Sequence, residues 1–241
     1  MDFIISLKEI VKIYGKGESK VVALNKVSLD ICKGDYISVM GPSGSGKSTL
    51  LNIIGCMDTP TTGQYILKGR DVSKLKRRDF SQIRNKDVSF VFQSFALLNN
   101  YSVYHNVELP LCHRRMSRSQ KKEIIMHYLD KLGIANLANK RPTEISGGQQ
   151  QRVAIARALA SDADIILADE PTGSLDQKTG QEIMELLTNI NSEGKTIVIV
   201  THDKNVASYC RRNILIVDGR IVEDNISDNI SKNCSESNVS L

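Results

Sequence analysis

One stretch constrains what this chain can fold into more than any other: Gly41-Pro42-Ser43-Gly44-Ser45-Gly46-Lys47-Ser48-Thr49. It fits the pattern G-x-x-x-x-G-K-[ST] of the phosphate-binding loop. That motif has a structural meaning only between a strand and a helix, and both are indicated here. An apolar run precedes it at 36–40 and a helix-compatible run follows at 48–54. The sequence therefore predicts an α/β core with a phosphate-binding loop.

The residue types in this loop explain its chemistry. Glycines let the backbone curl so that successive N–H groups point at phosphate oxygens, and a helix N-terminus favours an anion. Lys47 would reach the β- and γ-phosphates, while the Ser48 hydroxyl would bind Mg²⁺. A chance match in a Gly/Ser-rich turn is the alternative, but a Lys-Ser pair has little use in an ordinary turn. We expect a nucleoside triphosphate site.

The composition is that of a globular protein and leaves several partners open. The chain has 241 residues, of which 41% are hydrophobic, enough for one large domain or one domain with an insert. The net charge of +5 is mild and does not argue for nucleic acid. Basic residues concentrate weakly at 74–78 and 114–122. These are either a solvated face or a surface near the anionic cytoplasmic leaflet.

The cysteines and the hydropathy pattern indicate the cellular compartment that we expect for this chain. The five cysteines are scattered with no C-x-x-C pair, which favours reduced cytosolic thiols over disulfides or a zinc site. The N-terminus does not resemble a signal peptide, and no stretch approaches about 18 apolar residues. If this protein acts at a membrane, we expect another chain to supply the spanning part.

The order of patterns along the chain predicts its organisation. The pattern at 3–40 indicates short strands with turns, and a buried strand at 88–92 ends at Gln93, where α/β proteins bind ligands. Helical periodicity replaces strand signals at about 95–160, which indicates an inserted helical subdomain. A strand at 196–200 and a hairpin around Asp218-Gly219 follow. We expect one domain over 1–223 and a polar, mobile tail over 224–241.

A second candidate site element is the apolar run at 165–168, which ends in Asp169 and Glu170. Beside a phosphate-binding loop, two carboxylates at a strand end have a specific use. Asp169 would hold Mg²⁺, and Glu170 would orient and deprotonate an attacking water. An acidic pair on an exposed strand end is the alternative interpretation. The pair predicts hydrolysis of the bound triphosphate.

With these pieces in order, the sequence resembles the nucleotide-binding subunit of an ABC transporter over about residues 3–223. The deciding element is Ser146-Gly147-Gly148-Gln149, between the phosphate-binding loop and the Asp169-Glu170 strand. Ile145 stands where the family motif usually has Leu, a conservative departure. The resemblance implies a P-loop NTPase core with a mainly parallel sheet, an N-terminal antiparallel β subdomain and an inserted helical subdomain. It also implies ATP and Mg²⁺ as ligands.

The resemblance further implies roles for single residues. Tyr14 corresponds to the aromatic residue that stacks on adenine, although a lone Tyr at a strand end is more often a packing residue. Gln93 corresponds to the glutamine that senses Mg²⁺ and the γ-phosphate. His202 corresponds to the switch histidine at the γ-phosphate, which gives it a catalytic role beside Glu170 and Lys47. Ser174-Leu175-Asp176 matches a loop that contacts the other protomer.

The family architecture implies partners as well. Ser146, Gly147 and Gly148 would serve the nucleotide of a facing subunit, so that two chains sandwich two ATP molecules. The partner ATPase would be identical or a homologue. A separate integral-membrane permease is implied, which would place the chain at the cytoplasmic face of the membrane. Phe95 to Leu98 would lie where the permease docks.

Looser segments indicate a subgroup. The runs 51–63, 92–98 and 106–110 resemble subunits that serve lipoprotein release, macrolide export and antimicrobial-peptide export. We therefore expect export or membrane extraction of a peptide, lipoprotein or antibiotic-like substrate. The alternative is a soluble ABC ATPase that acts on ribosomes or DNA, but such proteins usually carry two cassettes or a long coiled coil. A nucleotide-dependent binding module without turnover and a phosphate-loop kinase fit the Glu170 and Ser146 motifs less well.

Overall fold

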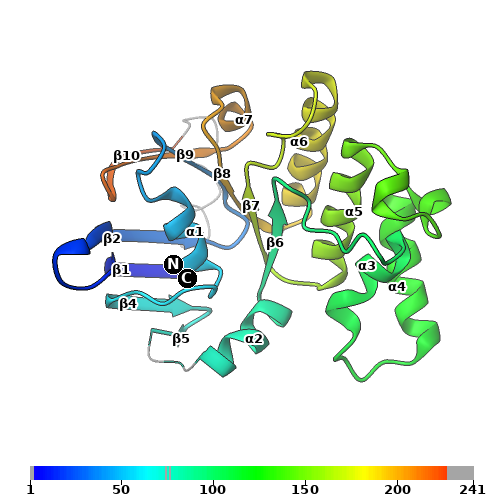
Figure 1. Cartoon of the computed structure of the whole chain (residues 1–241), viewed down its shortest axis with the longest axis horizontal. Helices are drawn as coiled ribbons and strands as arrows, with labels where there is room; N and C mark the ends of the chain where they lie inside the picture. The colour runs from blue at the N-terminus through cyan, green and yellow to red at the C-terminus, as the bar shows by residue number, and fades with distance from the viewer. Residues whose placement is uncertain (1–2, 74, 76, 227–241) are drawn as a thin grey trace, which may run out of the picture.

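The computed structural model describes residues 3–73, 75 and 77–226. Figure 1 shows an antiparallel sheet at one end, a mainly parallel sheet in the middle and a group of helices at the other end. The antiparallel sheet has the order β2-β1-β4-β5. Its strands are β1 (Phe3–Tyr14), β2 (Val21–Cys32), β4 (Thr62–Leu67) and β5 (Arg70–Asp71).

The central sheet has the order β10-β9-β3-β8-β7-β6. All neighbours are parallel except β9 and β10, which form a hairpin. Its strands are β3 (Tyr36–Met40), β6 (Val88–Phe92), β7 (Ile165–Asp169), β8 (Thr196–Val200), β9 (Arg212–Val217) and β10 (Arg220–Ile226). Because their carboxyl ends share one edge, the segments that follow β3, β7 and β8 meet there.

The helices connect and cover these sheets. The α-helices are α1 (Lys47–Ile54), α2 (Arg77–Lys86), α3 (Val103–Glu108), α4 (Arg118–Lys131), α5 (Gly147–Ala160), α6 (Gln177–Ser192) and α7 (Lys204–Ser208). Short 3-10 turns are η1 (Gly17–Ser19), η2 (Leu109–Leu111), η3 (Ala135–Leu137) and η4 (Pro142–Glu144). In the described part of the chain, no helix is both long and apolar enough to span a bilayer.

The alternation of side chains along the central strands builds two cores. Leu167 and Val198 face α1 and the antiparallel sheet, while their neighbours Ile166 and Ile197 face α5 and α6. Successive strand residues point to opposite faces, so a strand that is apolar throughout is buried on both. This explains why β7 and β8 read as continuous apolar runs in the sequence.

The expected fold class is confirmed, and one boundary is corrected. Residues 95–160, all of which are described, form helices and turns without a strand. The hairpin around Asp218-Gly219 is present, but β10 pairs with β9 through Ile226. The polar tail therefore does not begin at 224, because Asp224 and Arg212 pair across this hairpin. The remainder of the expected tail, 227–241, lies outside the described residues.

Candidate active site

The loop between β3 and α1 has a backbone that only glycine can supply. Gly41 and Gly46 have φ of +152° and +104°. A Cβ atom would lie 2.1 Å from the Ile216 carbonyl oxygen at Gly41, and 2.4 Å from the Ala23 carbonyl oxygen at Gly46. Gly44, with φ of +77°, has open space on its side. The loop is therefore packed against β2 and β9 at its two ends and open at its crest, the part around Gly44.

Lys47 begins α1 and turns back over this loop. Its Nζ donates to the carbonyl oxygens of Gly41 and Pro42, each at 2.8 Å. Ser45 is buried beneath the crest, and its hydroxyl has no partner among the described residues. No side chain of the described residues caps α1, so its first N–H groups have no side-chain partner. The other loop side chains are exposed or half-buried: Pro42, Ser43, Ser48 and Thr49.

The ends of β7 and β8 form the second part of the site. The Glu170 carboxylate accepts hydrogen bonds from the Thr201 hydroxyl at 3.1 Å and the His202 backbone N–H at 3.1 Å. His202 Nδ1 lies 2.7 Å from the same carboxylate. An ionised carboxylate has only acceptors, so Nδ1 carries the hydrogen in this contact. The Glu170 side chain is largely buried, whereas that of His202 is 75% exposed.

Asp169 lies between the loop and Glu170. Burial raises the pKa of this carboxyl, and the negative charge of Glu170 raises it further. Lys47 acts in the opposite direction and lowers the same pKa. Both charges therefore lie within electrostatic reach of Asp169, and the edge of the sheet joins the phosphate-binding loop to the acidic pair.

Tyr14 ends β1 and is 41% exposed. Its hydroxyl donates to Asp58 Oδ2 at 2.7 Å. The Thr49 side chain in the first turn of α1 lies close enough to this hydroxyl to lower its pKa, although burial and Asp58 raise that pKa overall. The predicted base-binding residue therefore lies beside the helix that begins at the phosphate-binding loop.

Gln93 follows β6, which is separated from β3 in the sheet by β8 and β7. Its side-chain amide lies against Gly173, where an added Cβ would be 2.7 Å from Gln93 Nε2. The next residues, Phe95 and Ala96, have positive φ of 61° and 48°. Arg157 holds their carbonyl oxygens at 3.0 and 2.6 Å. Gln93 thus contacts the loop after β7, and the loop that follows it is fixed to α5.

The Ser146-Gly147-Gly148-Gln149 segment forms the N-terminus of α5. The Ser146 hydroxyl accepts the Gln149 N–H at 3.3 Å, and the Gln149 side chain accepts the Ser146 N–H at 3.0 Å. This reciprocal pair is a capping box, and it fixes the first turn of the helix. In Figure 1, α5 lies on the far side of β6 and β7 from α1. The structure therefore does not bring this segment to the loop of its own chain.

The segment instead contacts the loop after β7. A Cβ atom at Gly147 would lie 3.3 Å from Leu175 Cδ2, and one at Gly148 would lie 2.4 Å from Thr179 Cγ2. Asp176 caps α6 by accepting the Thr179 N–H at 3.0 Å. Ser174 is exposed beside them. The predicted dimer-contact loop and the α5 N-terminus form one continuous surface.

Several side chains that build this site are not identified by any sequence motif. Thr201 orients Glu170, Arg157 fixes the loop after Gln93, and the buried Gln151 donates to the Pro171 carbonyl oxygen at 2.6 Å. Lys12 and Asp58 contact each other beside Tyr14. For Gln151 and Thr201, a polar residue type beside a motif is the only signal in the sequence, and that signal does not identify a partner.

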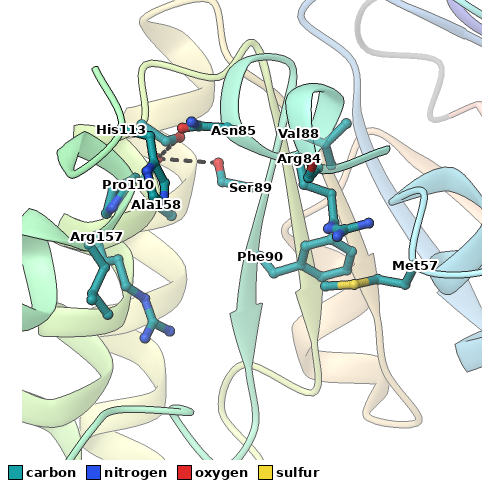
Figure 2. A pocket seen from close by; sticks show the side chains of 13 residues that line it. Met57, Arg84, Asn85, Val88, Ser89, Phe90, Pro110, His113, Arg157 and Ala158 are labelled. Atoms are coloured by element: carbon teal, nitrogen blue, oxygen red, sulfur yellow. Dashed lines mark hydrogen bonds between the residues drawn. The ribbon is translucent and has the colours of Figure 1, made fainter. Parts of the chain in front are cut away.

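A groove of about 380 Å³ opens between α2 and β6 on one side and η2 and α5 on the other. Ser89 donates to the Ala158 carbonyl oxygen at its base. Arg84 donates to the Cys56 carbonyl oxygen just after α1. Figure 2 shows its two walls, with Pro110, His113 and Arg157 on one side and Met57, Arg84 and Phe90 on the other.

Comparisons with known proteins agree on the family. A family model described as ABC transporter matches residues 24–173. The chain is 46% identical to the uncharacterized ABC transporter ATP-binding protein YknY of Bacillus subtilis, over 90% of this chain and 95% of that protein. It is 45% identical to the macrolide export ATP-binding/permease protein MacB of Marinobacter nauticus, over 92% of this chain. The match spans about a third (34%) of the length of that exporter.

Solved structures give the same result. The ATP-binding cassette MJ0796, solved as a dimer in a post-hydrolysis state with ADP and Pi, has a TM-score of 0.85 and 44% identity. The match covers 92% of this chain and 98% of that one. A second dimeric structure of MJ0796 is 46% identical with the same TM-score.

Proposed function

This chain belongs to the ABC transporter family as an ATP-binding subunit that hydrolyses ATP, and we propose that two such subunits power a separate membrane permease. The observation that carries the proposal is the separation of α1 and α5 within one chain. Each carries a helix N-terminus suited to phosphate, yet the two do not meet. A second copy in two-fold arrangement brings each α5 N-terminus to the other chain's loop.

The loop at 41–49 holds the triphosphate in this proposal. Its N–H groups bind phosphate oxygens, and Lys47 releases the carbonyl oxygens of Gly41 and Pro42 to neutralise the β- and γ-phosphates. Tyr14 contacts the base. From the facing chain, Ser146, Gly147, Gly148 and Gln149 close over the γ-phosphate. Ser174, Leu175 and Asp176 lie in the same interface.

The remaining groups perform hydrolysis. Glu170 orients the attacking water and accepts its proton, since Thr201 and His202 fix the carboxylate in one direction. His202, which is exposed toward the site, contacts the γ-phosphate. The water attacks the γ-phosphorus in line with the departing ADP. A bond between the water oxygen and the γ-phosphorus forms, the bond between ADP and the γ-phosphorus breaks, and phosphate is released. Loss of that phosphate removes the contacts between the chains, so the dimer opens.

Mg²⁺ fits the oxygen donors that this edge offers. We propose that Ser48, Asp169 and Gln93 hold it, with phosphate oxygens and water completing its shell. Among the described residues, no group of three or more His, Cys, Asp or Glu side chains is placed to hold a metal. That donor set suits an ion that arrives with the nucleotide. When bound, it neutralises charge on the phosphate oxygens.

The relatives that are named as macrolide exporters support export as the direction of transport. We propose that this subunit serves the export or membrane extraction of a peptide, lipoprotein or antibiotic-like molecule, since named relatives are macrolide exporters. In those relatives the ATP-binding and permease parts are named together in one protein. This chain would work with a separate permease at the cytoplasmic face of the membrane.

We propose the groove in Figure 2 as the permease docking surface. Phe95, which we expect where the permease docks, does not line this groove; its ring lies against Gly147, 3.6 Å from a Cβ atom there. His113, which lines the groove and is exposed, is therefore the better probe. His113→Glu should abolish stimulation of ATP hydrolysis by the permease and leave hydrolysis without it unchanged. His127→Glu, the same change on an exposed residue of α4 outside the groove, is the matched control.

Capture of the partner tests the proposal against a soluble role. Glu170→Gln, loaded with ATP, would be used to isolate its partners from detergent-solubilised membranes of the native cell. A stoichiometric integral membrane protein is the expected result, and its loss with His113→Glu but not His127→Glu would place it on the groove. Ribosomes or DNA-repair factors without a membrane protein would overturn the transport role.

A further inference from the structure

The end of β1 is shaped to direct Lys12 and Tyr14 to one face. Its pairing with β2 shifts register between Leu7 and Ile10, between Ile10 and Lys12, and between Lys12 and Ile13. Such bulges re-aim side chains and occur next to active sites. Residues two apart on a strand share a face, so Lys12 and Tyr14 lie together. Lys12 is only 8% exposed, while Tyr14 remains 41% exposed.

One carboxylate joins these two side chains. Lys12 Nζ donates to Asp58 Oδ1 at 2.7 Å, and the Tyr14 hydroxyl donates to Asp58 Oδ2 at 2.7 Å. Lys12 Nζ also donates to the Thr59 carbonyl oxygen at 2.8 Å. A buried ammonium needs such partners, because its desolvation is costly. Burial opposes ionisation of Asp58, but hydrogen bonds from Lys12, Tyr14 and the Thr59 N–H outweigh it and lower the pKa of this carboxyl.

The Tyr14 ring is held from one side. Lys12 Nζ lies 4.8 Å from the ring centroid, within the range of a cation–π contact. The ammonium occupies one face of the ring, which leaves the other face to a flat ligand. An aromatic ring that is already fixed loses less entropy when a base stacks on it. The arrangement prepares the ring for stacking.

The same carboxylate ties the ring to the phosphate-binding element. Asp58 lies in the turn after α1, and its N–H donates to the Asn52 carbonyl oxygen within that helix at 3.1 Å. Thr61 reinforces the contact, since its hydroxyl accepts the Ile13 N–H at 3.0 Å. Because α1 begins at the phosphate-binding loop, these contacts fix the spacing between the ring and the loop.

We propose that Asp58 and Lys12 are positioning residues that hold Tyr14 for the base of the nucleotide, a proposal that rests on the base-contact role proposed for Tyr14. They touch the base only through the tyrosine ring. Their effect is therefore confined to ligands that carry a base, and it is absent for the triphosphate part alone.

The test compares ATP with inorganic tripolyphosphate, which has no base. Binding of each to the full chain would be measured by calorimetry for Tyr14→Phe, Asp58→Asn and Tyr14→Ala. A full base–aromatic stack is worth about 5- to 150-fold in affinity. Tyr14→Phe and Asp58→Asn keep the ring and should lose only part of the stacking contribution. Each should therefore weaken ATP binding roughly 3- to 10-fold and leave tripolyphosphate binding unchanged. Asp162→Asn is the control, because Asp162 pairs with Lys195 at 3.2 Å on another part of the surface.

Each other outcome has a definite meaning. If Tyr14→Ala weakens ATP binding while Tyr14→Phe and Asp58→Asn do not, the positioning role is overturned and the base contact stands. If Tyr14→Ala leaves ATP binding unchanged, the base contact itself fails, and this proposal fails with it. Equal loss of ATP and tripolyphosphate binding in Asp58→Asn means a general structural effect and also overturns the proposal.

Discussion

Glu170 has a backbone φ of +47°, a conformation that residues other than glycine seldom adopt. Its N–H donates to the Val200 carbonyl oxygen at 2.9 Å, and Thr201 and His202 hold its carboxylate. Strained residues persist where their surroundings fix them, and they concentrate at active sites. At the scale of the residue, β8 therefore holds Glu170 in the orientation that its proposed role requires.

Glu170→Gln tests that role directly. An amide of the same shape keeps most contacts but cannot accept the proton of water, so ATP turnover should fall by at least about 100-fold. ATP affinity should change less than about 3-fold, because turnover and binding depend on different groups. Glu182→Gln, in an exposed pair with Arg152, is the control. Turnover within tenfold of the unmodified protein would exclude Glu170 as the base.

Asp58 gives a prediction on pH. Its pKa is lowered in the folded protein, so its contribution to stability is present above the unfolded pKa of about 3.9 and is lost as pH falls through the folded pKa. The Asp58 side chain is 22% exposed, and solvent screening still limits its contribution at pH 7 to roughly 0.5–1 kcal/mol. The Tm difference between the unmodified protein and Asp58→Asn should shrink between pH 7 and pH 3. A constant difference would show that the charge of Asp58 does not contribute.

Single residues differ in how far the sequence predicts them. Lys47 and Ser48 are identified by a motif, because backbone N–H groups and a lysine at fixed spacing have one common use. Asp58 lies near no motif, and its importance comes from folding of β1 over α1, with Lys12 46 positions away in the chain. Such long-range pairs depend on register, and a bulged strand does not reveal its register in the sequence.

At the scale of the element, the carboxyl edge of the central sheet assembles the site. β3, β8 and β7 are neighbours, although β7 follows β3 by more than a hundred residues. Their apolar runs predict buried parallel strands, but the sequence alone does not give their order. Gln151 then links α5 to the loop after β7, because its amide donates to the Pro171 carbonyl oxygen. The catalytic edge and the helical segment are joined through that loop.

The glycines of the loop give a matched pair of variants. Gly46→Ala places a Cβ atom 2.4 Å from the Ala23 carbonyl oxygen, so β2 or the loop must move. Gly44→Ala meets no atom within 4 Å, and only the cost of positive φ, about 1–2 kcal/mol, applies. We expect Gly46→Ala to lower the free energy of unfolding by more than about 3 kcal/mol. The free energy of unfolding of both variants would be measured by urea unfolding. Equal losses in Gly46→Ala and Gly44→Ala would contradict the packing described for this loop.

At the scale of the whole molecule, the chain holds the two proposed halves of the nucleotide site apart from each other. The phosphate-binding loop and the acidic pair lie on one side, and the α5 N-terminus lies on the other (Figure 1). The family resemblance predicted this division from the Ser146 motif, whereas no periodicity or composition indicates it. The sequence does not indicate the groove between α2 and η2, because its lining residues come from segments far apart in the chain.

The most direct measurement mixes two inactive variants and follows ATP hydrolysis. Lys47→Ala disables the loop, and Gly148→Asp disables the α5 N-terminus, so either variant alone should be inactive. In a mixed dimer, one site joins the intact loop of one chain to the intact α5 of the other. Half of randomly formed dimers are mixed, and each holds one intact site of two, so about one quarter of the activity should return.

The composite site proposed here requires that recovery. The result should depend on protein concentration, because the active species is a dimer. Activity of the mixture that equals only the sum of the two separate variants would contradict the account, since it would mean that each chain completes its own site.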